Sequence, residues 1–325
     1  MHTFTQDAIA PRIELGGLRA ILARGRNAAI AFVSEPASAR PLAMMRIGVA
    51  FVLLLQALAI APYLADFFGT RGIMQGVLID AVVSRELPRV SWLTRLLAPF
   101  GIRESASLAI CFCAYVASLH FLILGWHTRI AAVGAWLLHL TLKTSGNLSA
   151  YGVFEFATIA LFYCVCLPVG DAWSVDTRRD PRPPSAAARV GLRLLQLHLC
   201  VVYLSSGIEK ASGEQWRTGE AIWRAVMRPA FEPLDLSWMA TYGWVPMLAA
   251  WGTLAIEVGY TFLVWPRRTR KAFTLAAISM HVGIAAILGL WAFSGVMIAL
   301  NAAAFLISPE AGNEKGGPKA ALETH

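Results

Sequence analysis

Ionisable residues lie inside several apolar segments of this sequence, and two of them, Lys210 and Glu257, could carry proton-transfer chemistry. Lys210 follows residues 205–207, Ser-Ser-Gly, whose small side chains allow close helix packing. A lysine removed from water loses its proton more easily, so Lys210 could act as a general base. Glu257 has no cation within one helical turn, and we expect it to be protonated or paired with a cation from another helix. Glu209 adjoins Lys210 and could shield it or pair with it.

The remaining ionisable residues at this depth do not form a metal-binding pattern. They are Arg46, His120, His139, Lys143, Glu155, Arg193, His198 and His281. The histidines are single residues on different segments without a second ligand one turn away, so we predict no metal site. Arg46, Lys143 and Lys210 lie near the ends of their segments. The alternative to a functional role is that the side chain of each only extends to water at the membrane surface. All five cysteines also lie inside apolar segments, which does not indicate a disulfide framework.

The composition is that of a membrane protein. Of the 325 residues, 57% are hydrophobic and 15% are charged, whereas soluble domains have about 45–50% and about 25%. Apolar runs of about 20 residues recur, each long enough to cross a hydrocarbon core about 30 Å thick. We therefore predict an all-α polytopic membrane protein with about eight transmembrane spans. The candidate spans are residues 43–62, 105–125, 128–145, 150–169, 190–207, 244–265, 272–290 and 291–308.

The last two candidate spans follow from a length argument. Residues 272–308 contain no charged side chain. A single helix of that length would be about 55 Å long, nearly twice the hydrocarbon thickness. We expect a break within residues 289–295, which begin and end with glycine.

The basic residues orient the chain in the bilayer. The net charge is +8, and eight of the 28 basic residues lie in two connections, 170–189 and 267–271. Such clusters stay on the cytoplasmic side, so we predict a multi-pass protein of the cell membrane with a cytoplasmic N-terminus. The connections 63–104 and 208–243 would then lie on the other side. Because the charge has this topological explanation, no nucleic-acid partner is expected.

Amphipathic stretches flank the spans. Residues 1–41 form a predicted cytoplasmic segment with an interfacial helix, before a transmembrane domain at 42–308 and a flexible tail at 309–325. Residues 216–228 place tryptophans and other apolar side chains on one helical face and charges on the other, which predicts a helix in the membrane interface. Residues 92–100 show a weaker form of the same pattern.

Three blocks of the sequence carry a resemblance to a known family. The stretch Tyr203-Leu-Ser-Ser-Gly-Ile-Glu-Lys210, followed by Trp216-Arg-Thr-Gly-Glu-Ala, resembles the Y-x-x-x-G-x-x-K … W-x-x-G-x-A signature of the HTTM family. These horizontally transferred transmembrane proteins are bacterial relatives of vitamin K-dependent gamma-carboxylase. Residues 128–176 resemble the middle segment of that family, and His281 with residues 289–294 resembles its penultimate region. The similarity covers about residues 40–308.

The resemblance implies a membrane-embedded carboxylase core. In that chemistry a lysine deprotonates vitamin K hydroquinone, oxygen converts the quinol anion into a strong base, and this base removes a γ proton from a peptide glutamate before carbon dioxide adds. Lys210 stands at the position of that lysine. The cofactor would be vitamin K hydroquinone or menaquinol. The residues expected to line its pocket are Lys143, Asn147, Trp216, Glu257 and His281.

Two departures from the family pattern keep other functions open. The carboxylase has a histidine soon after its Lys-Thr-Ser segment, where this chain reads Gly-Asn-Leu-Ser at residues 146–149. No sequence after the last span matches the large domain that binds the propeptide, so we expect a peptide substrate to need a partner protein or another binding mode. The alternatives are a non-enzymatic factor for peptide-toxin maturation or immunity, as in the related sporulation-delaying proteins, and a DoxX-like quinone-interacting redox subunit.

Overall fold

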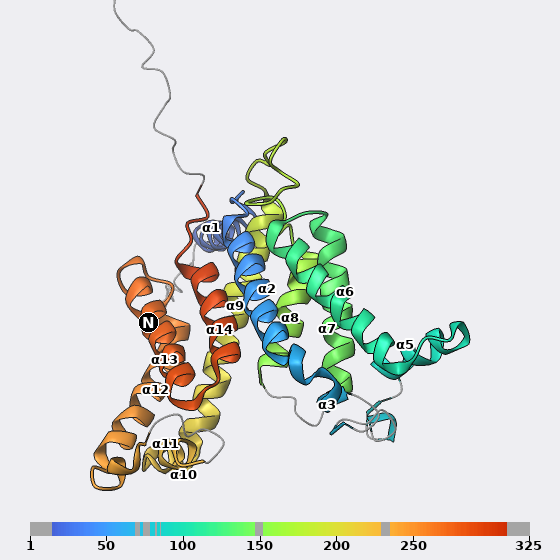
Figure 1. Ribbon diagram of the computed structural model, residues 1–325. Helices are drawn as coiled ribbons and strands as arrows, with labels where there is room; N and C mark the ends of the chain where they lie inside the picture. Colours follow the sequence, from blue (N-terminus) through green and yellow to red (C-terminus); the bar gives the residue numbers. More distant parts are fainter. Residues whose placement is uncertain are drawn as a thin grey trace, which may run out of the picture.

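The computed structural model describes residues 15–68, 72–73, 79–81, 83–84, 86–146, 152–228 and 235–310. This part of the chain is helical and contains no strand (Figure 1). The longer helices are α1 (Leu15–Ser34), α2 (Arg40–Ile60), α5 (Val90–Leu97), α6 (Glu104–Leu124), α7 (Thr128–Ser145), α8 (Gly152–Cys166), α9 (Ala186–Ser212), α12 (Trp244–Leu263), α13 (Arg267–Leu288) and α14 (Trp291–Phe305). The short elements are η1 (Ala61–Tyr63), α3 (Leu64–Phe68), η2 (Ala98–Phe100), α10 (Glu214–Arg217), α11 (Glu220–Val226) and η5 (Ser237–Ala240).

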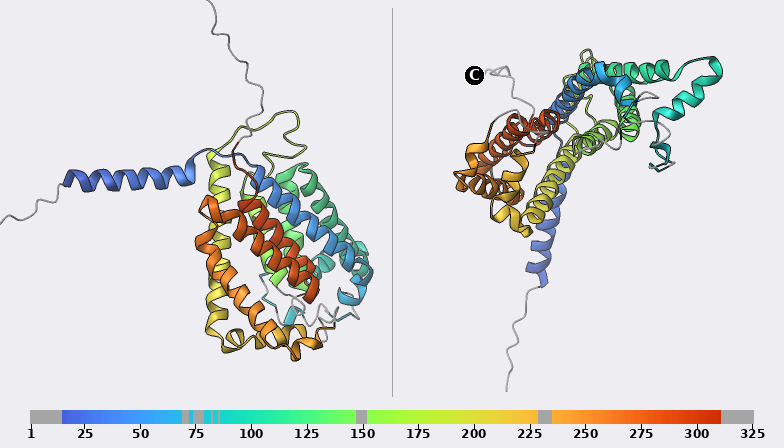
Figure 2. Two further views of the ribbon diagram at one scale, coloured as in Figure 1. Left: turned by 90° about the vertical axis from the view of Figure 1, so that its left-hand side faces the viewer. Right: turned by 60° about the horizontal axis from the view of Figure 1, so that its bottom comes forward.

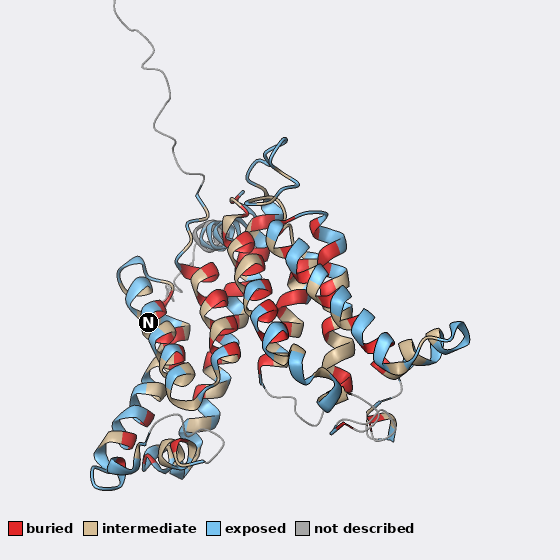
Figure 3. Cartoon of the chain, viewed as in Figure 1, coloured by how far each residue is buried: buried red, intermediate tan, exposed pale blue. Residues whose placement is uncertain are grey.

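The apolar segments form a bundle of antiparallel helices. Helices α2, α6, α7 and α8 pack together on one side, and α9, α12, α13 and α14 on the other, while α14 joins the halves by packing against α2. Successive helices run in alternating directions (Figures 1 and 2). Buried residues gather where the helices face one another, and the outward faces are exposed (Figure 3). The exposed faces include many large apolar side chains, as expected of a bundle surrounded by lipid.

Four stretches in the described part are long and apolar enough to cross a membrane. They are Arg40–Phe68, Glu104–Leu124, Ala186–Ser212 and Arg267–Leu288. Helices α8 and α14 are apolar but shorter. Every candidate span in the sequence coincides with a helix. The number of membrane crossings, eight in our prediction, stays a prediction.

The break expected in the last apolar segment is confirmed. Helix α13 ends at Leu288, and α14 begins at Trp291. Gly289 between them has a φ of 67°, the left-handed conformation that commonly ends a helix. The chain reverses there, so residues 267–305 form two antiparallel helices that pack along each other.

The single helix predicted over residues 216–228 is wrong. The structure divides this stretch into α10 and α11, which meet around Gly219. Gly219 has a φ of 83°, and a Cβ atom there would lie 2.5 Å from the backbone nitrogen of Met247. The periodic pattern gave no sign of this close approach to α12, which only glycine permits.

Arg46 is fully buried, so the expectation that it extends to water is also wrong. Its guanidinium donates to the carbonyls of Leu122 and Ile123 at the end of α6 and to those of Val169, Ala172 and Trp173 after α8. The carbonyls at a helix end have no partner within the helix and carry partial negative charge. Arg46 therefore fastens α2 to two connections at the same end of the bundle.

A carboxylate stabilises the neighbouring turn. Asp176 accepts hydrogen bonds from the backbone N–H groups of His127 and Thr128, both at 2.8 Å, and from the Thr128 hydroxyl at 2.7 Å. Partial burial by itself raises the pKa of Asp176, but these hydrogen bonds bring the pKa below its ordinary value. Asp176 thus caps the N-terminus of α7, where a negative charge is favourable.

Candidate functional site

The two residues singled out for proton transfer form an ion pair. Lys210 lies near the end of α9, and its Nζ donates to both carboxylate oxygens of Glu257 on α12, at 2.7 and 2.8 Å. The third donor of the ammonium goes to the hydroxyl of Ser206. The Glu257 side chain is 7% exposed and that of Lys210 is 24% exposed. Glu257 was expected to be either protonated or paired with a cation from another helix, and the structure shows the pairing. Glu209 is exposed, and the described ion pairs do not include it.

Small residues bring these two helices close enough to pair. A Cβ atom on Gly207 would lie 2.9 Å from Val258 Cγ2 and 3.1 Å from Glu257 Cβ. Any larger residue would push α9 away from α12 at the level of the pair. This agrees with the close helix approach expected from residues 205–207.

Trp216 covers the exposed side of the pair. The Nζ atom of Lys210 lies 5.4 Å from the centre of a Trp216 ring, within the range of a cation–π interaction. Trp216 belongs to α10, which is tied to α12 by a hydrogen bond from Trp251 Nε1 to the carbonyl of Arg217, 3.1 Å long. Lys210 therefore has a carboxylate on one side and an aromatic ring on another.

A buried polar chain lies deeper in the same half of the bundle. The Tyr203 hydroxyl contacts His281 Nε2 at 2.9 Å and accepts from Asn301 Nδ2 at 2.8 Å, while the Tyr260 hydroxyl donates to Asn301 Oδ1 at 2.7 Å. Tyr203 and Lys210 are seven residues apart on α9 and share a face, as do Glu257 and Tyr260 on α12. The ion pair and the polar chain thus occupy one interface.

Sequence reasoning missed part of this chain. It singled out His281 but not Tyr260 or Asn301, although an asparagine inside the charge-free segment 291–308 was a usable signal. The Nδ1 atom of His281 is buried and, among the described residues, has no hydrogen-bond partner. Buried polar atoms normally have one, so this nitrogen is available to a ligand or a water molecule.

Lys143 lies elsewhere, in the other half of the bundle. It pairs with Glu155 on α8 at 2.7 Å and lines a cavity of about 350 Å³. Lys210, Glu257, His281 and Trp216 are not among the residues that line this cavity. Of the five residues expected to line one cofactor pocket, Trp216, Glu257 and His281 lie in the same half of the bundle as Lys210, and Lys143 is separate. Asn147 lies outside the described residues.

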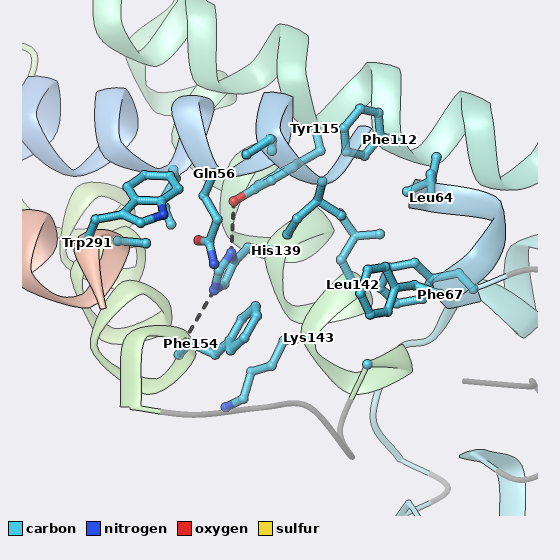
Figure 4. A pocket seen from close by; sticks show the side chains of 17 residues that line it. Gln56, Leu64, Phe67, Phe112, Tyr115, His139, Leu142, Lys143, Phe154 and Trp291 are labelled. Atoms are coloured by element: carbon cyan, nitrogen blue, oxygen red, sulfur yellow. Dashed lines mark hydrogen bonds between the residues drawn. The ribbon is translucent and has the colours of Figure 1, made fainter. Parts of the chain in front are cut away.

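The cavity has an apolar lining with a few polar groups. The Tyr115 hydroxyl contacts His139 Nδ1 at 2.9 Å, and His139 Nε2 lies 3.4 Å from the carbonyl of Phe154. Figure 4 shows His139 between these two residues, with Gln56 pointing toward its ring. The other lining residues are Leu53, Ala57, Ala59, Ile60, Leu64, Phe67, Phe68, Phe112, Leu142, Lys143, Gly146, Trp291 and Ala292.

Comparison with known proteins identifies the family. A model of the HTTM domain matches residues 86–308. The chain belongs to the HTTM domain family. It is also 24% identical, over 194 residues, to the uncharacterized protein YitO of Bacillus subtilis (strain 168). That similarity covers 56% of this chain and 62% of YitO, so the chain spans less than two thirds of that relative. No solved structure matches the sequence.

The HTTM region contains the ion pair and about half of the residues that line the cavity. Lys210, Glu257 and His281 fall within residues 86–308, whereas the α2 and α3 side of the cavity precedes it. The two places approach each other at the start of α14. Ala292 lines the cavity, and the ring of the next residue, Phe293, lies 5.5 Å from the His281 ring.

Metal ligands do not cluster in the described part of this HTTM protein. No group of three or more His, Cys, Asp or Glu side chains there could hold a metal ion. The histidines that are most buried contact tyrosines instead, as His139 does with Tyr115 and His281 with Tyr203. The groups placed to act chemically are therefore Lys210, Glu257 and the tyrosine–histidine contacts.

Proposed function

We propose that this HTTM protein is a gamma-carboxylase-related membrane enzyme that uses a quinol, with Lys210 and Glu257 accepting its proton. The observation that carries the proposal is the ion pair. If Lys210 only anchored the helix, a positive charge near the headgroups would be sufficient. A buried carboxylate facing that charge would not be needed. An ionisable pair held between two helices at the edge of a bundle is typical of a functional site.

The geometry of the pair sets the order in which its protons can move. All three hydrogens of the Lys210 ammonium are donated, two to Glu257 and one to Ser206. The Nζ atom can accept a further proton only after it has given one away. The nearest carboxylate oxygen, which can take up a proton, is Oε1 of Glu257, 2.7 Å distant. Lys210 and Glu257 therefore act as a unit, in which the carboxylate takes the proton that Lys210 must lose.

The cavity beside Lys143 suits a quinol ring. Lys210 and Glu257 do not line this cavity, so a proton from a quinol bound there reaches the pair only through intervening water or polar groups. Its volume of about 350 Å³ falls in the range of ligand pockets, and its lining is mostly aromatic and aliphatic. Gln56, Tyr115 and His139 offer hydrogen-bonding groups, which suits a flat apolar ring with a polar oxygen at each end. Vitamin K hydroquinone and menaquinol both have this chemistry. When bound, such a quinol supplies the reducing electrons and, with oxygen, the strong base for a carboxylation.

Filling the cavity is expected to weaken quinone binding. Ala59 lines the cavity yet is exposed, so Ala59→Trp can place a large ring in the cavity without burial of a misfitting side chain. The neighbouring Leu58 is exposed and does not line the cavity, so Leu58→Trp is the matched control. We expect binding of a short-chain menaquinone analogue to the purified protein to weaken at least about tenfold in Ala59→Trp, which corresponds to about 1.4 kcal/mol, and to be unchanged in Leu58→Trp.

Other results of this binding experiment would favour the alternative functions. Equal affinity in both variants would remove the cavity from the account. No quinone binding by the wild type would favour a non-enzymatic factor for peptide-toxin maturation or immunity. Binding accompanied by haem absorbance or direct quinone reduction would favour a DoxX-like redox subunit.

We further propose that the chain crosses the inner membrane eight times, with its N-terminus in the cytoplasm. The connections before α9 and before α13 carry the basic clusters, and both lie at the end of the bundle from which α1 departs (Figure 1). Their common position supports the orientation expected from positive charge. Lys210 and Lys143 lie at the other end, and a peptide substrate would approach from there.

A further inference from the structure

Helix α1 leaves the bundle crosswise (Figure 2). Its side chains from residue 21 onward are exposed, among them the large apolar residues Ile21, Leu22, Ile30 and Val33. The helix contains no acidic residue, and its polar side chains include Arg24 and Arg26. Helix α1 is thus exposed, carries apolar and basic side chains and runs across the bundle axis. These are the features of a helix that lies on a membrane surface.

Arginines of α9 hold the end of this helix. The Arg193 guanidinium lies 3.7 Å from the centre of the Phe32 ring, and its Nε donates to the Phe32 carbonyl at 2.9 Å. Arg189 Nε donates to the carbonyl of Glu35 at 2.8 Å. The ring of Phe32 also packs against that of Trp265, with centres 5.7 Å apart. Helix α1 is thus fixed where α9 meets the α12–α13 connection.

A third arginine joins the same place. Arg270 on α13 donates to the carbonyl of Trp265 at 2.8 Å, and the Arg193 guanidinium lies 6.0 Å from the Trp265 ring. Arg189 is one helical turn from Arg193, and Arg193 is near enough to Arg189, to Arg270 and to the carboxylate of Glu35 to interact electrostatically with all three. In the part of the chain that the structure describes, none of these three arginines takes part in an ion pair.

The three cations keep donors for a further group. Each guanidinium has five N–H donors, and the hydrogen bonds to carbonyls use one or two of them. A guanidinium group can donate two parallel hydrogen bonds to two oxygens of one phosphate. The cluster therefore favours an anion with several oxygens. Beside the cluster, the outward face of α9 carries the exposed apolar residues Leu194, Leu197 and Val201. A phosphate joined to acyl chains would match both the cations and this apolar strip.

We propose that Arg189, Arg193 and Arg270 bind the phosphate of an anionic phospholipid, whose acyl chains run along α9 while α1 lies on the headgroups of the same leaflet. Basic pockets between helices at a membrane surface suit such headgroups. The apolar strip and the crosswise helix favour a lipid over free phosphate, because free phosphate would use neither of them.

The test measures lipid binding by the purified full-length protein. Melting temperature is recorded in neutral detergent with added phosphatidylglycerol, phosphatidylcholine or inorganic phosphate, and retained lipid is measured by mass spectrometry. Phosphatidylglycerol is expected to raise the melting temperature, and the other two are not. Arg270→Gln is expected to bind phosphatidylglycerol about fivefold more weakly, and Arg193→Gln with Arg270→Gln about 25-fold, from about 1 kcal/mol for each cation.

Matched controls separate this site from general charge. Arg178 and Arg179 are exposed residues of the α8–α9 connection, and their double change to glutamine should leave lipid retention as in the wild type. The described hydrogen bonds of the Arg270 side chain go to Val264 and Trp265 and not to α1, so Arg270→Gln reports on the site even if changes at Arg193 loosen that helix. Unchanged retention in Arg270→Gln and in the double variant would overturn the proposal. An equal shift with phosphatidylcholine or with inorganic phosphate would overturn it as well.

Discussion

Glu257→Gln is expected to lower quinol turnover by about 10²- to 10⁴-fold, the usual contribution of a positioned acid–base group. Glutamine keeps the size of the side chain and its hydrogen bond to Lys210 but cannot receive the proton that Lys210 has to release. The Glu257 side chain is 7% exposed and lies 2.7 Å from Nζ, so water does not readily replace it. Turnover would be measured as quinone epoxide formed by purified protein supplied with reduced vitamin K, oxygen and bicarbonate.

The control for this variant is Glu209→Gln. Glu209 adjoins Lys210 in the sequence but is exposed and is not its ion-pair partner in the structure. We expect its replacement to leave turnover unchanged. Full epoxidation by Glu257→Gln, or equal loss in both variants, would show that the buried pair has no special part in proton transfer.

Arg46→Met is expected to destabilise the protein strongly. Methionine fills a similar space but has no donor, so the carbonyls of Val169 and Trp173 lose the partner that Arg46 provides, and that of Leu122 keeps only the backbone N–H of Gly125. Each buried polar group without a partner costs about 1–3 kcal/mol, and we expect a total loss of at least about 3 kcal/mol. The expected result is a lower melting temperature and a large aggregated fraction on heating in detergent.

Two further variants separate the loss of the hydrogen bonds from the loss of the charge. Arg46→Lys keeps the charge but has three donors in place of five, so an intermediate melting temperature is expected. Arg40→Met removes the same charge from the first turn of α2, where no side-chain hydrogen bond holds the arginine among the described residues, and should have a small effect. A melting temperature of Arg46→Met equal to that of the wild type would contradict the role given to these contacts.

The sequence located the helices well because apolar length is a strong signal in a membrane protein. Segments of about 20 apolar residues can be satisfied only as helices in lipid, and the charge-free run 272–308 was too long for one helix. The need for a break followed from that length, and the glycines at 289 and 295 indicated its place. Lys210 and Glu257 were also recognisable, since each places a titratable group in an apolar segment.

Features that depend on contacts between distant segments could not be read from the sequence. Arg46 lies near a span end, as a snorkelling side chain would, and only the carbonyls of distant segments show that it points inward. Gly219 interrupts an amphipathic pattern because α12 passes close to it. The separation of Lys143 from Lys210 has the same cause, since the resemblance assigned both to one pocket without fixing how the halves of the bundle pack.

The most direct measurement of the central claim is the rate of quinone epoxide formation by Lys210→Arg relative to the wild type. Arginine can keep the positive charge, the pairing with Glu257 and an anchor at the membrane surface, but it does not lose its proton near neutral pH. We predict that the variant has wild-type melting temperature and quinone affinity and loses about 100-fold or more of the rate. Epoxidation by Lys210→Arg at the wild-type rate would contradict the account, and would leave Lys210 as a structural cation.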